Sequence, residues 1–310
     1  MSDLKNMASC IAELKQLLPS DAVLINEPMS LHTTFQIGGP ADCFVMPSNV
    51  DEIVSVIKTV KKYAVPFTFL GKGSNLLVMD KGVRGVVLNL GDRFAKMELD
   101  DTQTVVKAQC GAGMTDVSKF AGSHGLTGLE YAVGIPGSVG GGIFMNAGAY
   151  DGEIKNIVKS VTAVSLDGEI KHFDNAQAQF GYRHSVFQDN NDLILAVELQ
   201  LAKGDAAKIK ARMDGLTQRR ESKQPLEMPS AGSTFKRPTG YFAGTLIDQT
   251  GLKGLTVGGA QVSKKHAGFV VNIGGATAQD VLDLIAEVQK RVYAAHGVKL
   301  YPEVRMLGEQ

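Results

Sequence analysis

The stretch that decides the fold runs from Gly128 to Tyr150 and reads GLEYAVGIPGSVGGGIFMNAGAY. Glycine recurs at every third residue, at Gly134, Gly137 and Gly140, and fills the two positions that follow. A backbone without Cβ atoms can turn sharply and come close to a ligand, which is how a chain cradles a phosphate. Apolar residues flank the glycines, where a solvated linker would carry Ser, Thr, Lys or Glu. We therefore interpret the stretch as a buried, ligand-facing loop rather than a flexible turn.

The composition is that of a folded protein with balanced charge. A chain of 310 residues is long enough for two or three domains with cores of their own. The 32 basic and 32 acidic residues cancel, and 44% of the residues are hydrophobic, so neither a polyanion-binding surface nor a disordered chain is expected. We therefore expect no nucleic-acid partner. The 35 glycines show no collagen-like period, which assigns them to turns and ligand loops.

The cysteines and the apolar runs indicate the compartment in which the protein is expected to work. Cys10, Cys43 and Cys110 lie far apart and form no C-x-x-C pair, which argues against a disulfide framework and a zinc site. No apolar run reaches membrane-spanning length, and the N-terminus lacks the basic segment and apolar core of a signal peptide. The sequence thus predicts a soluble cytoplasmic protein in a reducing compartment, with no metal and no membrane insertion.

The first half of the chain reads as an amphipathic helix followed by a β-α-β start. Apolar residues at helical spacing run from Leu4 to Leu18, where Pro19 stops the pattern. Asn49 and Glu52 resemble a capping box, which predicts a helix that ends before Pro66. Strands are predicted at residues 43–46, 67–70, 86–90 and 104–110, and a third helix at residues 114–125.

A second glycine turn follows the strand that ends at Leu70. It comprises Gly71, Lys72, Gly73, Ser74 and Asn75 and begins like G-x-G-x-x-G. The next residue is Leu, where that motif needs its third glycine, and no helical pattern follows. The turn is therefore a poor Rossmann fingerprint.

The second half of the chain alternates strands with helices, which predicts a mixed α+β protein. Asp167-Gly168 stands between two alternating runs and predicts a hairpin. From about Asp205 the character changes, which marks a smaller C-terminal domain. There the pattern predicts a helix that runs into a basic turn over residues 219–225, a loop at 229–238, a long helix at 278–297 and a strand at 298–301.

Taken in order, the motifs resemble one family. They are Thr33-Thr34-Phe35 with Ile37-Gly38-Gly39-Pro40, the Gly71–Asn75 turn, the loop from Ile135 to Gly141 with Asn146-Ala147-Gly148-Ala149-Tyr150, Tyr182-Arg183, Gly232-Ser233-Thr234-Phe235-Lys236, and Pro302-Glu303-Val304. This series resembles UDP-N-acetylenolpyruvoylglucosamine reductase, the MurB flavoenzyme family of peptidoglycan synthesis. The likeness covers the chain from about residue 30 to its end. Ser263-Lys264-Lys265-His266-Ala267-Gly268-Phe269 resembles the shorter-loop (type II) form of the family, because no extra tyrosine-bearing insertion is visible between Arg183 and Ser233.

The resemblance implies a fold and a reaction. The fold is an FAD-binding domain of the vanillyl-alcohol-oxidase (PCMH) type at residues 31–204, built of α+β subdomains at about 31–100 and 101–204. An N-terminal helix at 1–30 precedes it, and an α+β substrate-binding domain at 205–310 follows it. The implied enzyme is UDP-N-acetylmuramate dehydrogenase: NADPH reduces non-covalent FAD, and the reduced flavin saturates the enolpyruvyl double bond of UDP-N-acetylglucosamine enolpyruvate. No obligate protein partner is implied.

The resemblance also assigns three catalytic residues. Hydride adds to the terminal carbon of the enol ether, so negative charge grows on the adjacent carbon and on the carboxylate. Arg183 and Glu303 match the cation and the hydrogen-bonding acid beside that carboxylate, and Ser233 matches the proton donor. Taken singly, these residues would be a surface ion pair, a carboxylate on a sheet edge and a turn hydroxyl; only the ordered set of motifs reverses those interpretations.

The remaining site residues fall into two sets. His266 and Lys265 lie in a matching motif without an assigned role. Lys223 and Lys236 are candidates for contact with the substrate diphosphate, and Tyr182 and Gly232 complete the substrate set. The residues expected to hold FAD are Gly71, Lys72, Gly73, Ser74, Asn75, Gly134, Ile135, Pro136, Gly137, Ser138, Gly140, Gly141, Asn146, Ala147 and Gly148.

Two alternatives remain open at this stage. The first is a flavin oxidase of the same fold, which would react readily with oxygen and lack Ser233, Arg183 and Glu303 in these contexts. The second is a nucleotide-binding protein without catalysis, in which these three residues would do nothing. The colour of the purified protein tests the second alternative, because a yellow protein whose spectrum shifts on addition of the UDP-sugar binds both flavin and sugar.

Overall fold

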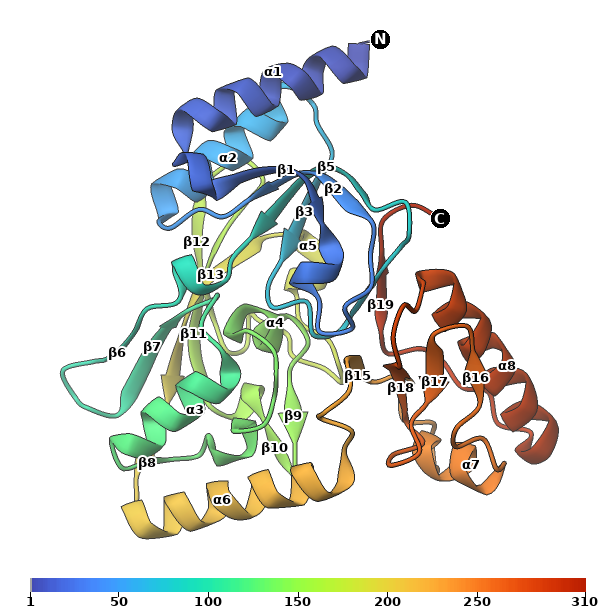
Figure 1. Ribbon diagram of the computed structural model, residues 1–310. Helices are drawn as coiled ribbons and strands as arrows, with labels where there is room; N and C mark the ends of the chain where they lie inside the picture. The colour runs from blue at the N-terminus through green and yellow to red at the C-terminus, as the bar shows by residue number, and fades with distance from the viewer. Residues whose placement is uncertain (1) are drawn as a thin grey trace. The chain divides into compact units, whose positions relative to one another are not determined.

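The computed structural model describes residues 2–310 and shows two compact units (Figure 1). The first unit comprises residues up to 25, 43–72 and 85–219, and the second comprises residues 26–42, 73–84 and 220–310. The chain therefore passes between the units several times, and one of these passages lies within the Gly71–Asn75 turn. Met1, which the sequence places in the N-terminal segment, lies outside the described residues.

Helix α2 shows why the N-terminal part of the chain forms the predicted elements. Asn49 caps the helix, because its side chain accepts a hydrogen bond from the Glu52 N–H at 2.9 Å. The apolar positions of the helix are buried, as the spacing predicts. In the parallel β3–β5 pair, Leu70 lies opposite Asn89, and β3 leads directly into the Gly71–Asn75 turn. The helices are α1 (Ser2–Leu17) and α2 (Val50–Lys62), and the four-stranded sheet has the order β1 (Val23–Pro28), β2 (Pro40–Val45), β5 (Val83–Asn89), β3 (Phe67–Leu70).

A five-stranded antiparallel sheet forms the second layer of the first unit. The predicted hairpin at Asp167-Gly168 is confirmed: Val164 pairs with Ile170, and Gly168 has a φ of 84°, in the left-handed region that glycine tolerates. The strand order is β12 (Ile170–Asp174), β11 (Val158–Val164), β13 (Leu193–Gln200), β7 (Val105–Gln109), β6 (Met97–Leu99).

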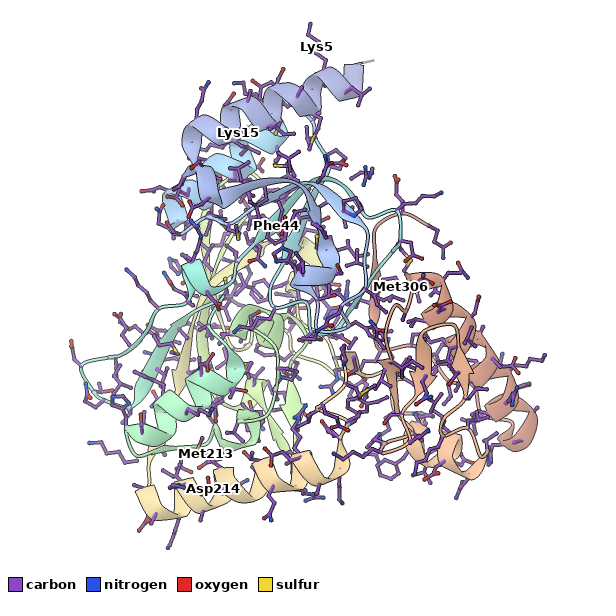
Figure 2. The ribbon with its side chains drawn as sticks, viewed as in Figure 1. Lys5, Lys15, Phe44, Met213, Asp214 and Met306 are labelled. Carbon is purple, nitrogen blue, oxygen red and sulfur yellow. The ribbon has the colours of Figure 1, made fainter. Side chains whose placement is uncertain are left out.

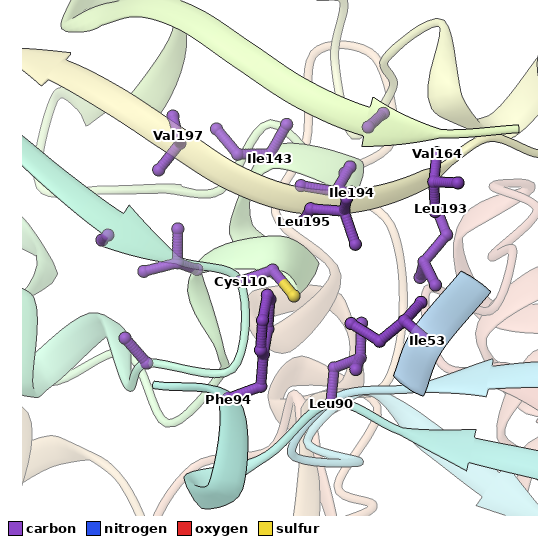
Figure 3. Close-up of a cluster of buried hydrophobic side chains, with 14 of the residues drawn as sticks. Ile53, Leu90, Phe94, Cys110, Ile143, Val164, Leu193, Ile194, Leu195 and Val197 are labelled. Carbon is purple, nitrogen blue, oxygen red and sulfur yellow. The ribbon is translucent and has the colours of Figure 1, made fainter. Parts of the chain in front are cut away.

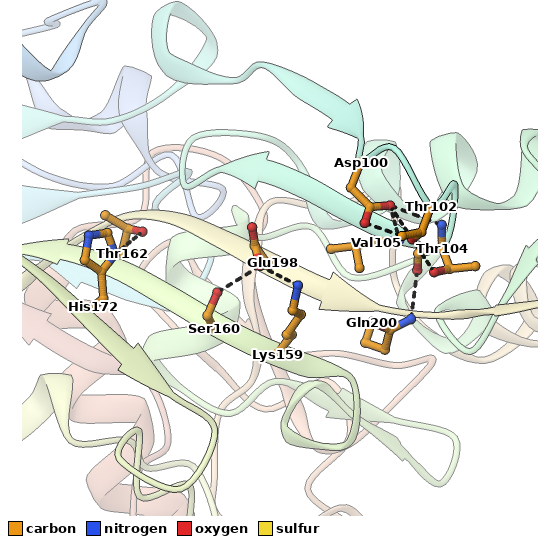
Figure 4. Close-up of polar contacts among 10 residues, drawn as sticks. All are labelled: Asp100, Thr102, Thr104, Val105, Lys159, Ser160, Thr162, His172, Glu198 and Gln200. Atoms are coloured by element: carbon orange, nitrogen blue, oxygen red, sulfur yellow. Dashed lines mark hydrogen bonds and ion pairs between the residues drawn. The ribbon is translucent and has the colours of Figure 1, made fainter.

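Polar cross-strand contacts fix the register of this sheet (Figure 4). Glu198 on β13 accepts hydrogen bonds from Ser160 at 3.2 Å and from Lys159 at 3.1 Å. At the turn between β6 and β7, the Asp100 carboxylate accepts the Val105 N–H at 3.0 Å. Such pairs each contribute a few tenths of a kcal/mol to about 1 kcal/mol to sheet stability.

One hydrophobic core joins the two layers of the first unit. Ile53 on α2, Phe94 after β5 and Leu195 on β13 belong to the same buried cluster, which also surrounds Cys110 (Figure 3). Burial strongly raises the pKa of the Cys110 thiol, so this cysteine is a packed apolar side chain and not a reactive one. The two parts that the sequence treats as subdomains therefore share a single core.

Helix α6 (Ala206–Lys223) corrects one prediction. The sequence predicts that residues 219–225 form a basic turn, but the helix continues to Lys223 and ends before Pro225. The helix packs on α3, because Met213 Sδ lies 2.9 Å from the position of a Cβ built on Gly122 (Figure 2). This contact joins α6 to the first unit, which extends to residue 219.

The short elements of the first unit connect these layers. They are α3 (Met114–Ser123), α4 (Val139–Phe144), α5 (Phe187–Asn190), β8 (Leu126–Thr127), β9 (Gly148–Ala149), β10 (Gly152–Glu153), β14 (Ala202–Lys203) and the 3-10 turns at Ser20–Ala22, Asp92–Phe94, Glu130–Ala132 and Ile154–Asn156.

The second unit places one long helix against a small sheet. Helix α8 (Ala278–His296) begins with a capping box between Thr277 and Asp280 and ends at Gly297, which has a φ of 68°. Its buried face packs in a separate core with side chains such as Phe35 and Phe235. The sheet order is β15 (Ser230–Ser233), β18 (Phe269–Asn272), β17 (Ala260–Val262), β16 (Thr256–Val257). The 3-10 turn at Met29–His32 and helix α7 (Ala243–Gln249) complete this part.

The C-terminal strand differs from the prediction. Residues 298–301 form no strand; the strand lies later, as β19 (Arg305–Leu307), and pairs in parallel with β4 (Leu76–Val78). The apolar pattern of residues 298–301 instead reflects the burial of Leu300. The pairing of β19 with β4 brings the segment around Glu303 to the end of the Gly71–Asn75 turn.

Candidate functional site

The Gly71–Asn75 turn packs closely against other parts of the protein. A Cβ on Gly71 would lie 2.3 Å from Ser138 Oγ, so no larger residue fits there without displacing that hydroxyl. The Asn89 amide donates hydrogen bonds to the carbonyls of Leu70, at 3.3 Å, and Gly71, at 2.9 Å. In a planar trans peptide the N–H points opposite to the C=O, so the Lys72 N–H points away from Asn89.

Gly73 continues the same arrangement. It has a φ of 59°, and a Cβ at this position would lie 2.2 Å from the His32 carbonyl oxygen. The Gly73 carbonyl accepts the Thr34 N–H at 3.3 Å, which turns the N–H of Ser74 away from Thr34. The carbonyls of Gly71 and Gly73 are thus held by protein donors, and the N–H groups of Lys72 and Ser74 point away from those donors. Backbone N–H groups of a glycine turn are donors of the kind that bind anions.

Part of the central segment, which the sequence predicts to be a buried, ligand-facing loop, forms a short helix instead. Ser138 caps the short helix α4, because its hydroxyl accepts the Gly141 N–H at 3.3 Å. Gly140 and Gly141 therefore lie in a helix. Gly140 is explained by packing, since a Cβ there would lie 2.8 Å from Cys110 Cβ. Before the helix, the Gly137 carbonyl accepts the Met114 N–H at 2.9 Å, which turns the Ser138 N–H outward.

Asn146 is a buried residue in the left-handed region, with a φ of 43°. Its Oδ1 accepts the Lys155 N–H at 3.2 Å, and its Nδ2 donates to Glu153 Oε2 at 3.0 Å and to the Gly181 carbonyl at 2.8 Å. Its neighbour Ala147 accepts the Ile154 N–H, and Gly148 pairs with Glu153 in the β9–β10 hairpin. This segment therefore joins the central loop to the turn that carries Arg183.

Arg183 lies in a tight turn closed by two hydrogen bonds between Gly181 and His184, at 3.0 and 3.3 Å. Its φ of 54° is in the left-handed region, which costs a non-glycine residue of order 1 kcal/mol. The Gln188 amide donates to the Arg183 carbonyl at 2.9 Å, and the guanidinium lies 5.7 Å from the centre of the exposed Tyr182 ring. A strained backbone held by side-chain hydrogen bonds is a frequent property of functional sites.

The second unit brings together three residues that are far apart in sequence. Ser233 ends strand β15 and is exposed. One residue later, the Thr234 carbonyl accepts the Glu303 N–H at 2.8 Å. Asn75 then joins this pair, because its Nδ2 donates to the Glu303 carbonyl at 3.3 Å. The end of the glycine turn, the serine and the glutamate thus lie on directly bonded segments.

The remaining candidates are more exposed. A Cβ on Gly232 would meet nothing within 4 Å, so the space around this residue does not require glycine. Its φ of 75° does, because this left-handed conformation is strained for other residues. Lys223 at the end of α6 and Lys236 after β15 are both exposed. Lys265 donates to the Glu221 carbonyl at 2.6 Å. Burial lowers the pKa of His266, whose Nδ1 accepts the Gly268 N–H at 3.1 Å, so the ring is neutral at neutral pH.

Sequence reasoning missed the residues that hold these segments in place. Asn89, Gln188 and Glu153 carry no motif, and only the structure shows the carbonyls and amides that they contact. An Asn at the end of a buried strand and a Gln after a Tyr-Arg pair are signals too common to single out. Within residues 2–310, no group of His, Cys, Asp and Glu is arranged to hold a metal ion, and no helix combines the length and the hydropathy of a membrane span.

Comparison with protein families defines the class first. Residues 41–174 match the FAD binding domain family, and both glycine segments fall within that span. The N–H groups of Lys72 and Ser74, which point away from the donors that hold the preceding carbonyls, are groups from which a cofactor phosphate can accept hydrogen bonds. The chain is therefore an FAD-binding α+β protein of the PCMH type.

The rest of the chain identifies the family. Residues 224–307 match the C-terminal domain of UDP-N-acetylenolpyruvoylglucosamine reductase. The enzyme of that name from Pediococcus pentosaceus is 51% identical over 94% of this chain and 96% of its own length, and the one from Clostridioides difficile is 49% identical over 96% and 97%. The crystal structure of the MurB enzyme from Thermus caldophilus superposes with a TM-score of 0.79 at 33% identity, and covers 92% of this chain and 98% of that one. The chain belongs to the UDP-N-acetylenolpyruvoylglucosamine reductase (MurB) family.

Proposed function

We propose that the protein catalyses the NADPH-dependent reduction of UDP-N-acetylglucosamine enolpyruvate to UDP-N-acetylmuramate, a step of peptidoglycan precursor synthesis. One observation carries the proposal: nearly the whole chain matches reductases of this name, and its Ser233 and Glu303 lie on segments joined by a 2.8 Å hydrogen bond from Glu303 N–H to Thr234 O.

FAD is the cofactor, and the glycine segments are the proposed place where it is held. The proposed contacts are Gly71 to Asn75, Gly134 to Ser138, Gly140, Gly141 and the segment from Asn146 to Gly148, chiefly through backbone N–H groups. When bound, FAD supplies a two-electron carrier between NADPH and the substrate double bond. The central loop has no His or Cys with which to form a covalent flavin bond, so we expect the cofactor to be released by acid precipitation.

Arg183 and Glu303 are the proposed groups beside the substrate carboxylate. As the double bond accepts hydride, charge spreads from the adjacent carbon onto the carboxylate, and a fixed cation there lowers the barrier. The arginine fork can donate parallel hydrogen bonds to a planar carboxylate, and its strained turn holds it in one place. Glu303 adds a hydrogen-bonding acid to the same end of the substrate.

Ser233 is the proposed proton donor to the carbon next to the carboxylate. A serine hydroxyl is a weak acid, but a carbanion-like intermediate is a strong base, so the transfer runs downhill. The exposed position of Ser233 at the end of β15 leaves its hydroxyl accessible to substrate.

The nucleotide part of the substrate requires further contacts. We propose Tyr182, Lys223, Gly232 and Lys236 for this role, since two of them are exposed cations that suit a diphosphate. The proposed domains are an N-terminal helix at 1–30, an FAD-binding domain at 31–204 and a substrate-binding domain at 205–310. NADPH and nucleotide-linked sugars are soluble metabolites, which supports a cytoplasmic reaction without an obligate protein partner.

The test is a coupled measurement on the purified yellow protein. We expect NADPH oxidation to depend on added enolpyruvyl UDP-N-acetylglucosamine and to yield a product heavier by two hydrogens. Acid precipitation should leave the flavin in the supernatant. NADPH consumption that needs oxygen and ignores the sugar would instead identify a flavin oxidase, and no consumption at all would indicate a binding protein.

A further inference from the structure

Two neutral amide side chains hold the backbone of the turn that carries Arg183. Before the arginine, Asn146 Nδ2 donates to the Gly181 carbonyl at 2.8 Å. At the arginine itself, Gln188 Nε2 donates to the Arg183 carbonyl at 2.9 Å and to the Phe144 carbonyl at 2.7 Å. These two amides hold the turn at the carbonyls of Gly181 and Arg183.

Both N–H donors of the Asn146 carboxamide are used within the protein. They go to Gly181 and Glu153, and the amide oxygen accepts the Lys155 N–H. A primary amide has only two N–H donors, so neither remains for a cofactor. The donor side of this carboxamide therefore serves the protein's own backbone and the Glu153 carboxylate.

Glu153 connects the Asn146 amide to the β9–β10 hairpin and interacts with the charges of Lys155 and Arg183. It ends the β9–β10 hairpin, whose Gly152 lies so close to the buried Tyr131 ring that a Cβ would be 2.4 Å from it. The hydrogen bond from Lys155 lowers the pKa of Glu153, burial opposes this, and the Asn146 hydrogen bond and the charges of Lys155 and Arg183 lower the pKa further. The carboxylate is therefore an anion, and the amide that it contacts also bonds the carbonyl of Gly181, two residues before Arg183.

We propose that Asn146 and Glu153 are positioning residues for Arg183 in the reduction of the enolpyruvyl group. Asn146 fixes the turn through Gly181, and the Glu153 carboxylate, held by the same amide, orients the guanidinium. The proposal rests on the role given to Arg183 in the proposed function. It predicts that the two residues act on the step that consumes the enolpyruvyl substrate and leave the step that consumes NADPH unchanged.

The first experiment removes the charge alone. In Glu153→Gln the new amide oxygen can still accept the Asn146 N–H, so the backbone network stays in place while the anion is lost. Stopped-flow absorbance of the flavin follows its reduction by NADPH and its re-oxidation by enolpyruvyl UDP-N-acetylglucosamine separately. We expect the limiting rate of re-oxidation to fall about tenfold without a rise in the apparent substrate Kd, and the reduction rate to remain that of the wild type.

Two comparisons make the experiment specific. Lys155→Met breaks the 2.9 Å ion pair with Glu153 from its other end and should not slow re-oxidation. The double variant Glu153→Gln, Arg183→Ala should be no slower than Arg183→Ala alone, because a residue that acts through the arginine has no effect once the arginine is absent.

A second variant tests the amide. Asn146→Gly removes the carboxamide and keeps a residue that tolerates the left-handed backbone. Its matched control is Asn191→Gly, because Asn191 is exposed and has a φ of 57°. Asn146→Gly should slow re-oxidation by about tenfold or more while the flavin content stays that of the control. If Asn146→Gly fails to fold, the comparison of Glu153→Gln, Arg183→Ala and their double variant still tests the positioning role.

The outcomes separate the two proposals. Wild-type re-oxidation in Glu153→Gln, or equal effects of Glu153→Gln with and without Arg183, would overturn the positioning role and leave the proposed function standing. Wild-type re-oxidation in Arg183→Ala would overturn the role of Arg183 itself, and the positioning role with it. Loss of flavin from Asn146→Gly at unchanged re-oxidation per bound flavin would assign Asn146 to cofactor binding instead.

Discussion

The Arg183 turn and the Ser233–Glu303 segments differ in how much side chains contribute to their support, although the Asn75 side chain also bonds the Glu303 carbonyl. The Arg183 turn is held at its carbonyls by the side chains of Asn146 and Gln188. Ser233 and Glu303 lie on segments that bond main chain to main chain: Glu303 N–H to the Thr234 carbonyl and Lys236 N–H to the Tyr301 carbonyl, both at 2.8 Å. A position held by side chains can be lost through a single neighbouring substitution, whereas one held by main chain depends little on its neighbours' side chains.

The largest effect should come from removing a functional group at the main-chain-held site. In Ser233→Ala, NADPH should reduce the flavin at the wild-type rate. Re-oxidation of the flavin by the enolpyruvyl sugar should be slower by roughly 10²–10⁴-fold, because a positioned acid accelerates proton transfer by about that factor. Stopped-flow flavin absorbance resolves the two steps. Ser230→Ala, on the same strand, is the control and should behave as wild type. Fast re-oxidation in Ser233→Ala would mean that another group delivers the proton.

The next effect concerns the glycine turn. Gly71→Ala places a Cβ 2.3 Å from Ser138 Oγ and drives that hydroxyl from its cap on the Gly141 N–H. We expect a loss of about 1–3 kcal/mol in unfolding free energy, as for other overpacked sites, together with weaker retention of flavin on gel filtration. The control is Gly215→Ala, where a Cβ meets nothing within 4 Å and the better helix propensity should stabilise the protein. Full flavin content in Gly71→Ala would show that the turn does not hold the cofactor.

A smaller effect tests the comparison directly. Gln188→Ala removes the donor to the Arg183 carbonyl and should slow re-oxidation about tenfold, since a hydrogen bond to a buried group contributes about 1–2 kcal/mol. Tyr301→Ala truncates a side chain that is 62% exposed and leaves its carbonyl bonded to Lys236, so it should change the rate less than twofold. Equal effects of the two variants would remove the distinction between side-chain and main-chain support.

The smallest effect lies away from both sites. In α8, Asp280 accepts the N–H of Thr277 at 3.0 Å and of Gly259 at 3.1 Å, and these hydrogen bonds lower its pKa. Asp280→Ala should cost about 0.5–2 kcal/mol of unfolding free energy and leave the re-oxidation rate unchanged. Because the folded pKa lies below the unfolded value of about 3.9, this contribution is complete at neutral pH and is lost as the pH falls through the folded pKa.

Urea unfolding at several pH values measures this difference. The gap between wild type and Asp280→Ala should be constant from pH 7 to about pH 5 and shrink below pH 4. Asp283→Ala, on the exposed face of the same helix, should show a smaller and less pH-dependent change. A gap that widens in acid would contradict the assignment of the cap.

The local signals of the sequence predicted much of the fold. The Asn49 cap, the Asp167-Gly168 hairpin and the long helix that ends at Gly297 are all confirmed. Each depends on residues only a few positions apart, so the sequence contains the whole interaction. The family resemblance, which the comparisons confirm, came from motif order and not from any of these local signals.

The errors fall where tertiary packing overrides a local pattern. The sequence assigns Gly140 to Gly142 to a buried, ligand-facing loop, but these residues lie in a short helix that Ser138 caps, and Gly140 packs on Cys110. The basic segment after Arg219 looked like a turn, but it completes α6 up to Lys223. The sequence predicts a strand at 298–301, but the strand of this region is β19, because β4 pairs with residues 305–307.

By itself, the sequence determined the α+β class, the positions where glycine leaves the backbone without a Cβ, and the residue types that suit the chemistry. Only the tertiary structure decided what holds them. Asn75 meets Glu303 across 228 positions of sequence, and Asn146 meets Gly181 across 35. The physical reason is that a side-chain amide can pair with any carbonyl of the chain. Which carbonyl it meets is set by the packing of strands and helices that have no local relation to it.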